Sequence, residues 1–97
     1  MATWESVTRW IGAELSTHEE GSAVSVVLDG NLIIIFPPDE EDVPIIRMVA
    51  PVARRDADRN RPLYLQSPVE ISEATPARIL RAVRGFARTV AAVRCAA

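Results

Sequence analysis

Few residues of this 97-residue chain could carry out catalysis. His18 is the only histidine, and its imidazole, beside Glu19 and Glu20, could act as a general base. Cys95 is the only cysteine, and the neighbouring Arg94 would favour its thiolate form. A single histidine in an acidic loop is usually a solvated side chain, however, and a thiol so near the last residue has no pocket around it. We therefore expect neither residue to be catalytic.

A run of acidic residues at 39–42 could attract a hard cation, but it lacks the alternating spacing and final glutamate of an EF-hand loop. Acids that follow two prolines, Pro37 and Pro38, are typical of a solvated turn that discourages aggregation at a sheet edge. The sequence also lacks a glycine-rich phosphate loop, the Cys-His spacing of a zinc site and a serine-nucleophile motif. It therefore predicts a protein that is not an enzyme and has no cofactor, metal or small-molecule substrate.

The size of the chain predicts a single domain that spans residues 1–97. The longest uninterrupted apolar run, residues 32–36, is far shorter than the roughly 20 residues that cross a bilayer. The first residues lack the pattern of a secretory signal, and a single cysteine cannot form an internal disulfide. These features predict a cytoplasmic protein.

Charge is divided unevenly along the chain. Residues 1–42 carry nine acids and one arginine, whereas residues 43–97 carry four acids and ten arginines. Four of these arginines recur at helical spacing near the C-terminus, at Arg78, Arg81, Arg84 and Arg88. Such a stripe could contact nucleic acid, an anionic surface or an acidic protein segment, or it could be a solvated face. The pI of about 5.3 and the lack of aromatic residues among the arginines disfavour nucleic acid.

Two helices must position these residues. Thr3 can cap the first helix, which has a narrow apolar stripe. Trp10 lies beside that stripe and is either a packing residue or part of an interface. Thr75 and Pro76 form a start signal for the second helix, which should run to about Arg94 with the four arginines opposite its apolar face.

Residues 23–36 predict a β-hairpin whose two-residue turn is Asp29-Gly30. With that turn, Val24 pairs with Ile35 and Val26 with Ile33 on one face, and the other face holds Val27, Leu32 and Ile34. Neither face is polar, although a sheet that is wetted on one side should alternate apolar and polar residues. A short chain has little material to cover both faces. We therefore expect a partner to cover one of them.

Two further strands should follow the hairpin. The third is predicted at about 44–53, where Pro51 requires a sheet edge or a bulge. The fourth is predicted at 62–71, bent or interrupted at Ser67-Pro68. The segments 16–22 and 54–61 are expected to be connections. The resulting fold class is α+β: a short N-terminal helix, a three- to four-stranded antiparallel sheet and a long C-terminal helix.

This order of elements resembles the small α/β fold of bacterial type III secretion chaperones and their non-secretion relatives. The similarity rests on the first helix, the hairpin at 24–36, the strand through residues 45–49 and the long helix that begins at Thr75. It implies a homodimer that holds an extended segment of a client protein.

From its residues and this resemblance, we expect a non-catalytic protein-binding module, either a chaperone or an assembly adaptor. Its partner would be a second copy or a protein client. The expected partner-binding residues are Trp10, Val24, Val26, Ile33, Ile35, Arg78, Arg81, Arg84 and Arg88. The alternative is a protein that binds nucleic acid or an anionic surface through the arginine face of the last helix.

Overall fold

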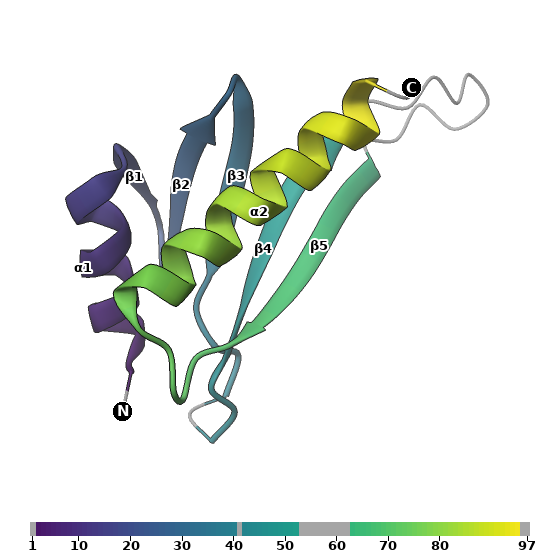
Figure 1. The fold of residues 1–97 in the computed structure, drawn as a ribbon. Helices are drawn as coiled ribbons and strands as arrows, with labels where there is room; N and C mark the ends of the chain where they lie inside the picture. Colours follow the sequence, from purple (N-terminus) through teal and green to yellow (C-terminus); the bar gives the residue numbers. More distant parts are fainter. Residues whose placement is uncertain (1, 41, 53–62, 96–97) are drawn as a thin grey trace.

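The computed structural model describes residues 2–40, 42–52 and 63–95. The chain begins with α1 (Trp4–Glu14) and continues through five strands to a long helix. The strands are β1 (Thr17–Glu20), β2 (Ala23–Leu28), β3 (Asn31–Phe36), β4 (Ile45–Val52) and β5 (Leu63–Glu70), and the last helix is α2 (Pro76–Cys95). The strands form one antiparallel sheet in the order β1-β2-β3-β4-β5, and both helices lie on the same face of it (Figure 1). The predicted α+β class and the order of helix, sheet and helix are confirmed.

Hydrogen bonds to polar side chains start both helices, as the sequence predicts. The Thr3 Oγ1 accepts from the backbone N–H of Ser6 at 3.2 Å, and the Ser6 Oγ accepts from the backbone N–H of Thr3 at 2.8 Å. This reciprocal pair satisfies two N–H groups that the first turn of α1 would otherwise leave unbonded. At α2, the Thr75 Oγ1 accepts from the backbone N–H of Arg78 at 3.3 Å, and Pro76 is the first helical residue.

The β2–β3 hairpin has the predicted register. Val24 pairs with Ile35, and Val26 with Ile33. Asp29 and Gly30 both have positive φ angles, 52° and 78°, which match the two-residue turn that suits the twist of a hairpin.

Segment 16–22, predicted as a connection, instead contains strand β1. Its residues pair with β2 from Thr17 opposite Val26 to Glu20 opposite Ala23. The strand is polar because it lies at the edge of the sheet, where charged side chains prevent pairing with other chains. An edge strand of this kind has no alternation of apolar residues, which is the signal that predicts strands from sequence.

The predicted interruption at Ser67-Pro68 is wrong, since β5 is continuous through both residues. β5 is the other edge of the sheet, so alternate N–H groups point away from the ladder and proline is tolerated there. Pro51 of β4 is tolerated for the same reason, because its strand has no β3 partner at that position. The pairing with β3 ends at Val49, so Pro51 is paired only with Tyr64 of β5. The predicted connection at 54–61 lies outside the described residues.

The core lies between the helices and one face of the sheet, which we call the inner face. α1 contributes Val7 and Ile11, and α2 contributes a longer stripe of side chains that includes Ile79 and Val83. The sheet contributes alternate residues of β2, β3 and β4, which are Val26, Ile33, Ile35, Ile46, Met48, Ala50 and Val52. Both helices are thus used to cover the inner face.

Candidate functional site

The opposite face of the sheet, which we call the outer face, is covered by none of the described elements. Its residues alternate with those of the inner face along each strand. The register places Val27 beside Leu32, and Pro51 beside Tyr64. The apolar residues of this face are Val27, Leu32, Ile34, Phe36, Ile45, Val49, Pro51, Tyr64 and Pro68. Val27 is 61% exposed, Tyr64 54% and Leu32 40%. An apolar surface that crosses four strands is therefore open to solvent.

Arg47 is the charged residue nearest the centre of the outer face, and its buried Nε has no hydrogen-bond partner among the described residues. Its guanidinium lies 5.5 Å from the centroid of the Phe36 ring, and its Nη2 lies 3.4 Å from an Asp39 carboxylate oxygen. Phe36 and Arg47 are directly opposite each other in the β3–β4 ladder, which places the cation beside the ring. Of the other polar side chains on this face, Ser25 of β2 is buried. His18 and Glu20 lie on β1, and Gln66 and Glu70 lie on β5, the two edge strands. The outer face therefore has an apolar centre and a polar margin.

Glu70 is an acid at this margin with a shifted pKa. Hydrogen bonds from the Ser72 hydroxyl and, secondarily, from the Ser72 backbone N–H lower the pKa of Glu70 below its ordinary value. The backbone bond is 2.9 Å long. The Glu70 carboxylate therefore takes up a proton only at a lower pH than an ordinary glutamate does.

Four of the predicted partner-binding residues lie on the inner face, which corrects their assignment to an interface. Val24, Val26, Ile33 and Ile35 are all buried. They face this chain's own helices and have almost no surface left for a partner. The outer face is the other apolar face that the hairpin pattern predicted, and it holds Val27 and Leu32. Trp10 is half-buried and packs against the core cluster.

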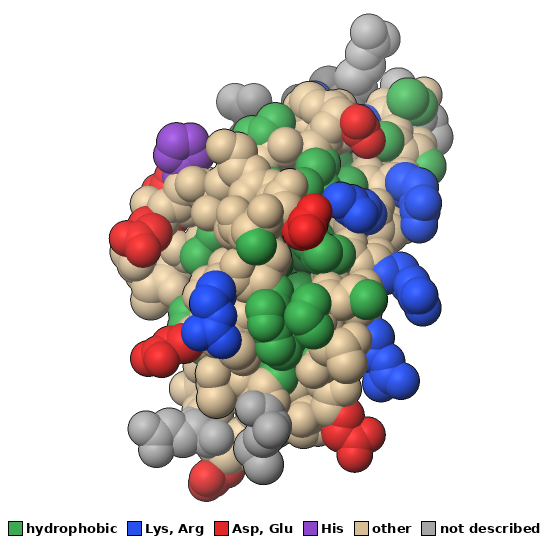
Figure 2. All heavy atoms as spheres, turned by 60° about the vertical axis from the view of Figure 1, so that its left-hand side comes forward, with side chains coloured by type: hydrophobic (Ala, Val, Ile, Leu, Met, Phe, Trp, Pro, Cys, Tyr) green, Lys and Arg blue, Asp and Glu red, His purple; other side chains and the backbone are tan. Residues whose placement is uncertain are grey.

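The four predicted arginines form a stripe along the solvent side of α2. Arg78, Arg81, Arg84 and Arg88 are all exposed. In Figure 2, most of the basic side chains follow one edge of the view, acidic side chains lie on the opposite edge and also elsewhere, and a group of hydrophobic side chains lies near the centre. Together with Glu14 of α1, the last three arginines line an open groove of about 470 Å³ whose apolar residues are Ala77 and Leu80. We call this the arginine groove.

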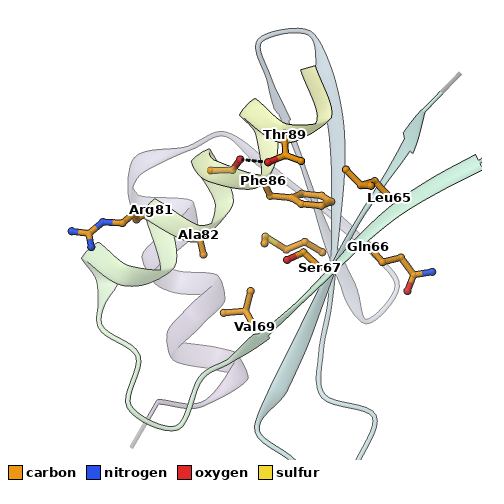
Figure 3. Close-up of a pocket in the computed structure, with 10 residues that line it drawn as sticks. Leu65, Gln66, Ser67, Val69, Arg81, Ala82, Phe86 and Thr89 are labelled. Carbon is orange, nitrogen blue, oxygen red and sulfur yellow. Dashed lines mark hydrogen bonds between the residues drawn. The ribbon is translucent and has the colours of Figure 1, made fainter. Parts of the chain in front are cut away.

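A second groove, of about 500 Å³, lies between α2 and β5 (Figure 3). It exists because α2 leaves the inner side of the edge strand partly uncovered, so that Leu65 and Val69 are only half-buried. Phe86 points into the groove, whereas Arg81 extends away from it. The Thr89 hydroxyl donates to the Gly85 carbonyl at 3.1 Å and is thus used by the helix itself. The walls offer apolar contact and no reactive group.

His18 and Cys95, the two residues with the greatest catalytic potential, are both exposed. Among the described residues, no three His, Cys, Asp or Glu side chains come together in a way that could hold a metal ion. No helix in the described part of the chain has the length and apolar character needed to cross a membrane.

Comparisons with models of protein families, with curated proteins and with solved structures gave no match to this chain. The structure shows the topology alone, a helix, an antiparallel sheet of five strands and a second helix, and the resemblance to secretion chaperones stays a prediction.

Proposed function

We propose that this protein is a non-catalytic protein-binding module, a chaperone or assembly adaptor, whose interface is the outer face of the sheet. The observation that carries the proposal is the exposure of one continuous apolar surface across β2, β3, β4 and β5. Val27, Leu32 and Tyr64 are far more exposed than the apolar residues of the inner face. Large apolar patches of this kind mark interaction sites in soluble proteins.

The occupant that best fits the outer face is a second copy of the same chain. Strands about 4.8 Å apart and residues about 3.3 Å apart give five strands of this length a flat area of roughly 500 Å². The relief of the side chains enlarges the accessible area further. A stable interface buries about 600 Å² or more on each partner, so pairing of two outer faces reaches the lower limit.

The charges of the molecule also favour this mode of pairing. Arg47 at the centre of the outer face is already paired with Asp39. Two copies that meet through their outer faces therefore bring apolar centres together with polar margins around them, as in known interfaces. The other broad surface of the molecule carries the arginine stripe, and two copies would repel each other there.

The test is the mass of the particle in solution. Light scattering on a sizing column should give two chains at micromolar concentration. The double variant Val27→Ser/Leu32→Ser should dissociate the dimer without unfolding the subunit, because both side chains are exposed. Burial of a Val or Leu side chain is worth about 1.5–3 kcal/mol when complete. With Val27 61% and Leu32 40% exposed, the two copies together should lose about 3–6 kcal/mol of association free energy, which raises the dimer Kd by at least about 100-fold.

A matched control is Val93→Ser on α2, where the side chain is 38% exposed, much as Leu32 is, but lies away from the outer face. This variant should remain a dimer. A monomeric wild-type protein at high micromolar concentration would refute pairing with a second copy. An unchanged Kd in the double variant would refute the outer face as the interface. Pull-down of a client by the wild type and not by the double variant would assign the face to a client instead.

A further inference from the structure

The arginine groove has two properties that a merely solvated helix face does not need. Its cationic side chains lie three and four residues apart on α2, so Arg81, Arg84 and Arg88 are neighbours along one side of the helix. Like charges at these spacings repel each other. Within the described residues, the one ion pair is that of Arg47 with Asp39, on the outer face. The charge of the stripe is therefore available to an external acid.

The groove also has an apolar floor. Ala77 and Leu80 belong to the same side of α2 as the three arginines, and Leu80 is half-buried rather than sealed in the core. An apolar side chain of a partner could lie on Leu80 while acidic groups on either side reach the guanidinium groups. Guanidinium groups bind carboxylates through paired, charge-assisted hydrogen bonds.

The spacing of the arginines fits a protein segment. Arg81 and Arg88 are about 10 Å apart along the helix axis, at 1.5 Å per residue. In an extended chain, acids on one side lie at alternate residues, about 7 Å apart, which is close to the roughly 6 Å between Arg84 and Arg88 along the helix axis. On a second helix, acids seven residues apart would match the distance from Arg81 to Arg88.

Glu14 of α1 contributes the one acidic side chain that lines the groove. It lies across from the arginines and would repel an unbroken row of phosphates, whereas a peptide can place a neutral or basic residue opposite it. No aromatic side chain lines the groove to stack on a nucleotide base. These features favour a protein partner over a nucleic acid or an anionic membrane.

From this arrangement we propose that the arginine groove binds an acidic protein segment with an apolar side chain among its acids. This site is separate from the outer face, so the proposal does not depend on whether the protein forms the proposed dimer. It would give the module a second, salt-sensitive contact with a client or an assembly partner.

The test measures binding of a short fluorescein-labelled peptide, in which a central leucine is flanked by aspartates and glutamates, by fluorescence anisotropy. One comparison peptide replaces the acids by their amides, and another replaces the leucine by serine. Wild-type protein should bind the parent peptide at low salt, and affinity should fall as salt is added. Both comparison peptides should bind more weakly.

Substitutions in the chain locate the site. Arg84→Glu should weaken the binding of the parent peptide by about 10-fold, because a repulsive charge replaces an attractive one. Glu14→Gln should strengthen it about twofold, because it removes the acid that opposes the ligand. The control is Arg9→Gln, which removes a charge from the exposed side of α1 and should leave the affinity within about twofold.

Three results would overturn the proposal. The first is no binding of the parent peptide at low salt. The second is equal affinity for the acidic peptide and its amide counterpart. The third is tighter binding of a single-stranded oligonucleotide or of vesicles containing phosphatidylserine, lost in Arg84→Glu, which would assign the stripe to nucleic acid or to an anionic surface.

Discussion

The substitution Arg84→Glu should make the free protein more stable. In the wild type, Arg84 has like-charged neighbours three residues before it, Arg81, and four residues after it, Arg88. A glutamate at this position turns both repulsive pairs into attractive ones, and in the second pair the acid precedes the base, which is the better order. At about 0.2–0.5 kcal/mol for each of the two pairs lost and the two pairs gained, the free energy of unfolding should rise by roughly 0.8–2 kcal/mol. For a domain of this size, that corresponds to an increase in Tm of about 3–16 °C.

The assay is urea unfolding followed by circular dichroism, at low salt and again at 1 M NaCl. Salt at that concentration reduces the Debye length to about 3 Å, so most of the gain should vanish. Arg9→Glu is the matched control, because it makes the same change of charge on α1. There it places an acid four residues after Glu5, so this variant should be less stable than the wild type at low salt.

Two results would refute this reasoning. The first is a variant Arg84→Glu that is no more stable than the wild type at low salt, since the arginine stripe would then be neutralised within the chain. The second is a gain that persists undiminished at 1 M NaCl, since it would then come from something other than charge. Together with the peptide measurement, the first result would also weaken the case for an acidic ligand.

The remaining predictions concern the glycines and one carboxylate. Gly85→Ala should stabilise α2 by up to about 1 kcal/mol, because the added Cβ lies 3.9 Å from its nearest side-chain neighbour and alanine favours the helix. Gly30→Ala should instead cost about 1 kcal/mol, because its φ of +78° is strained for alanine although the site is open; urea unfolding that gave both changes the same sign would contradict the structure. Ser72→Ala should raise the pKa of Glu70 toward its ordinary value in an NMR titration. Because the pKa of Glu70 is lowered in the folded protein, its ionised carboxylate stabilises the fold at neutral pH, and this stabilisation is lost as the pH falls through the folded pKa. In Ser72→Ala, the stability of the protein should therefore fall less on acidification than it does in the wild type.

The parts of the fold that depend on neighbouring residues could be predicted from the sequence. The hairpin register follows from the two residues of its turn, and the helix starts follow from Thr3, Thr75 and Pro76. Strand β1 could not be predicted, because its existence depends on pairing with β2 rather than on its own residues. The continuity of β5 through Pro68 depends likewise on its place at the edge.

The covered face of the sheet could not be chosen from the hairpin alone, because both faces of β2 and β3 are apolar. The residues that distinguish the covered face from the exposed face lie in β4 and β5. Arg47 of β4 shares a face with Gln66 of β5, whereas the alternate residues Met48 and Leu65 are apolar. Aligning those strands with the hairpin would have identified Val27 and Leu32 as the exposed pair. The arginine groove could not be predicted from the sequence, because it depends on how α1 packs beside α2.

The two ends of the sheet determine how far association through the outer face can proceed. β1 is short and acidic, and β5 contains a proline, so neither outermost strand is a good template for strands of another molecule. Growth of a continuous intermolecular sheet is thereby discouraged. In the proposed dimer, the outer face of each subunit would be buried against that of the other. Association through this face alone would then stop at two subunits.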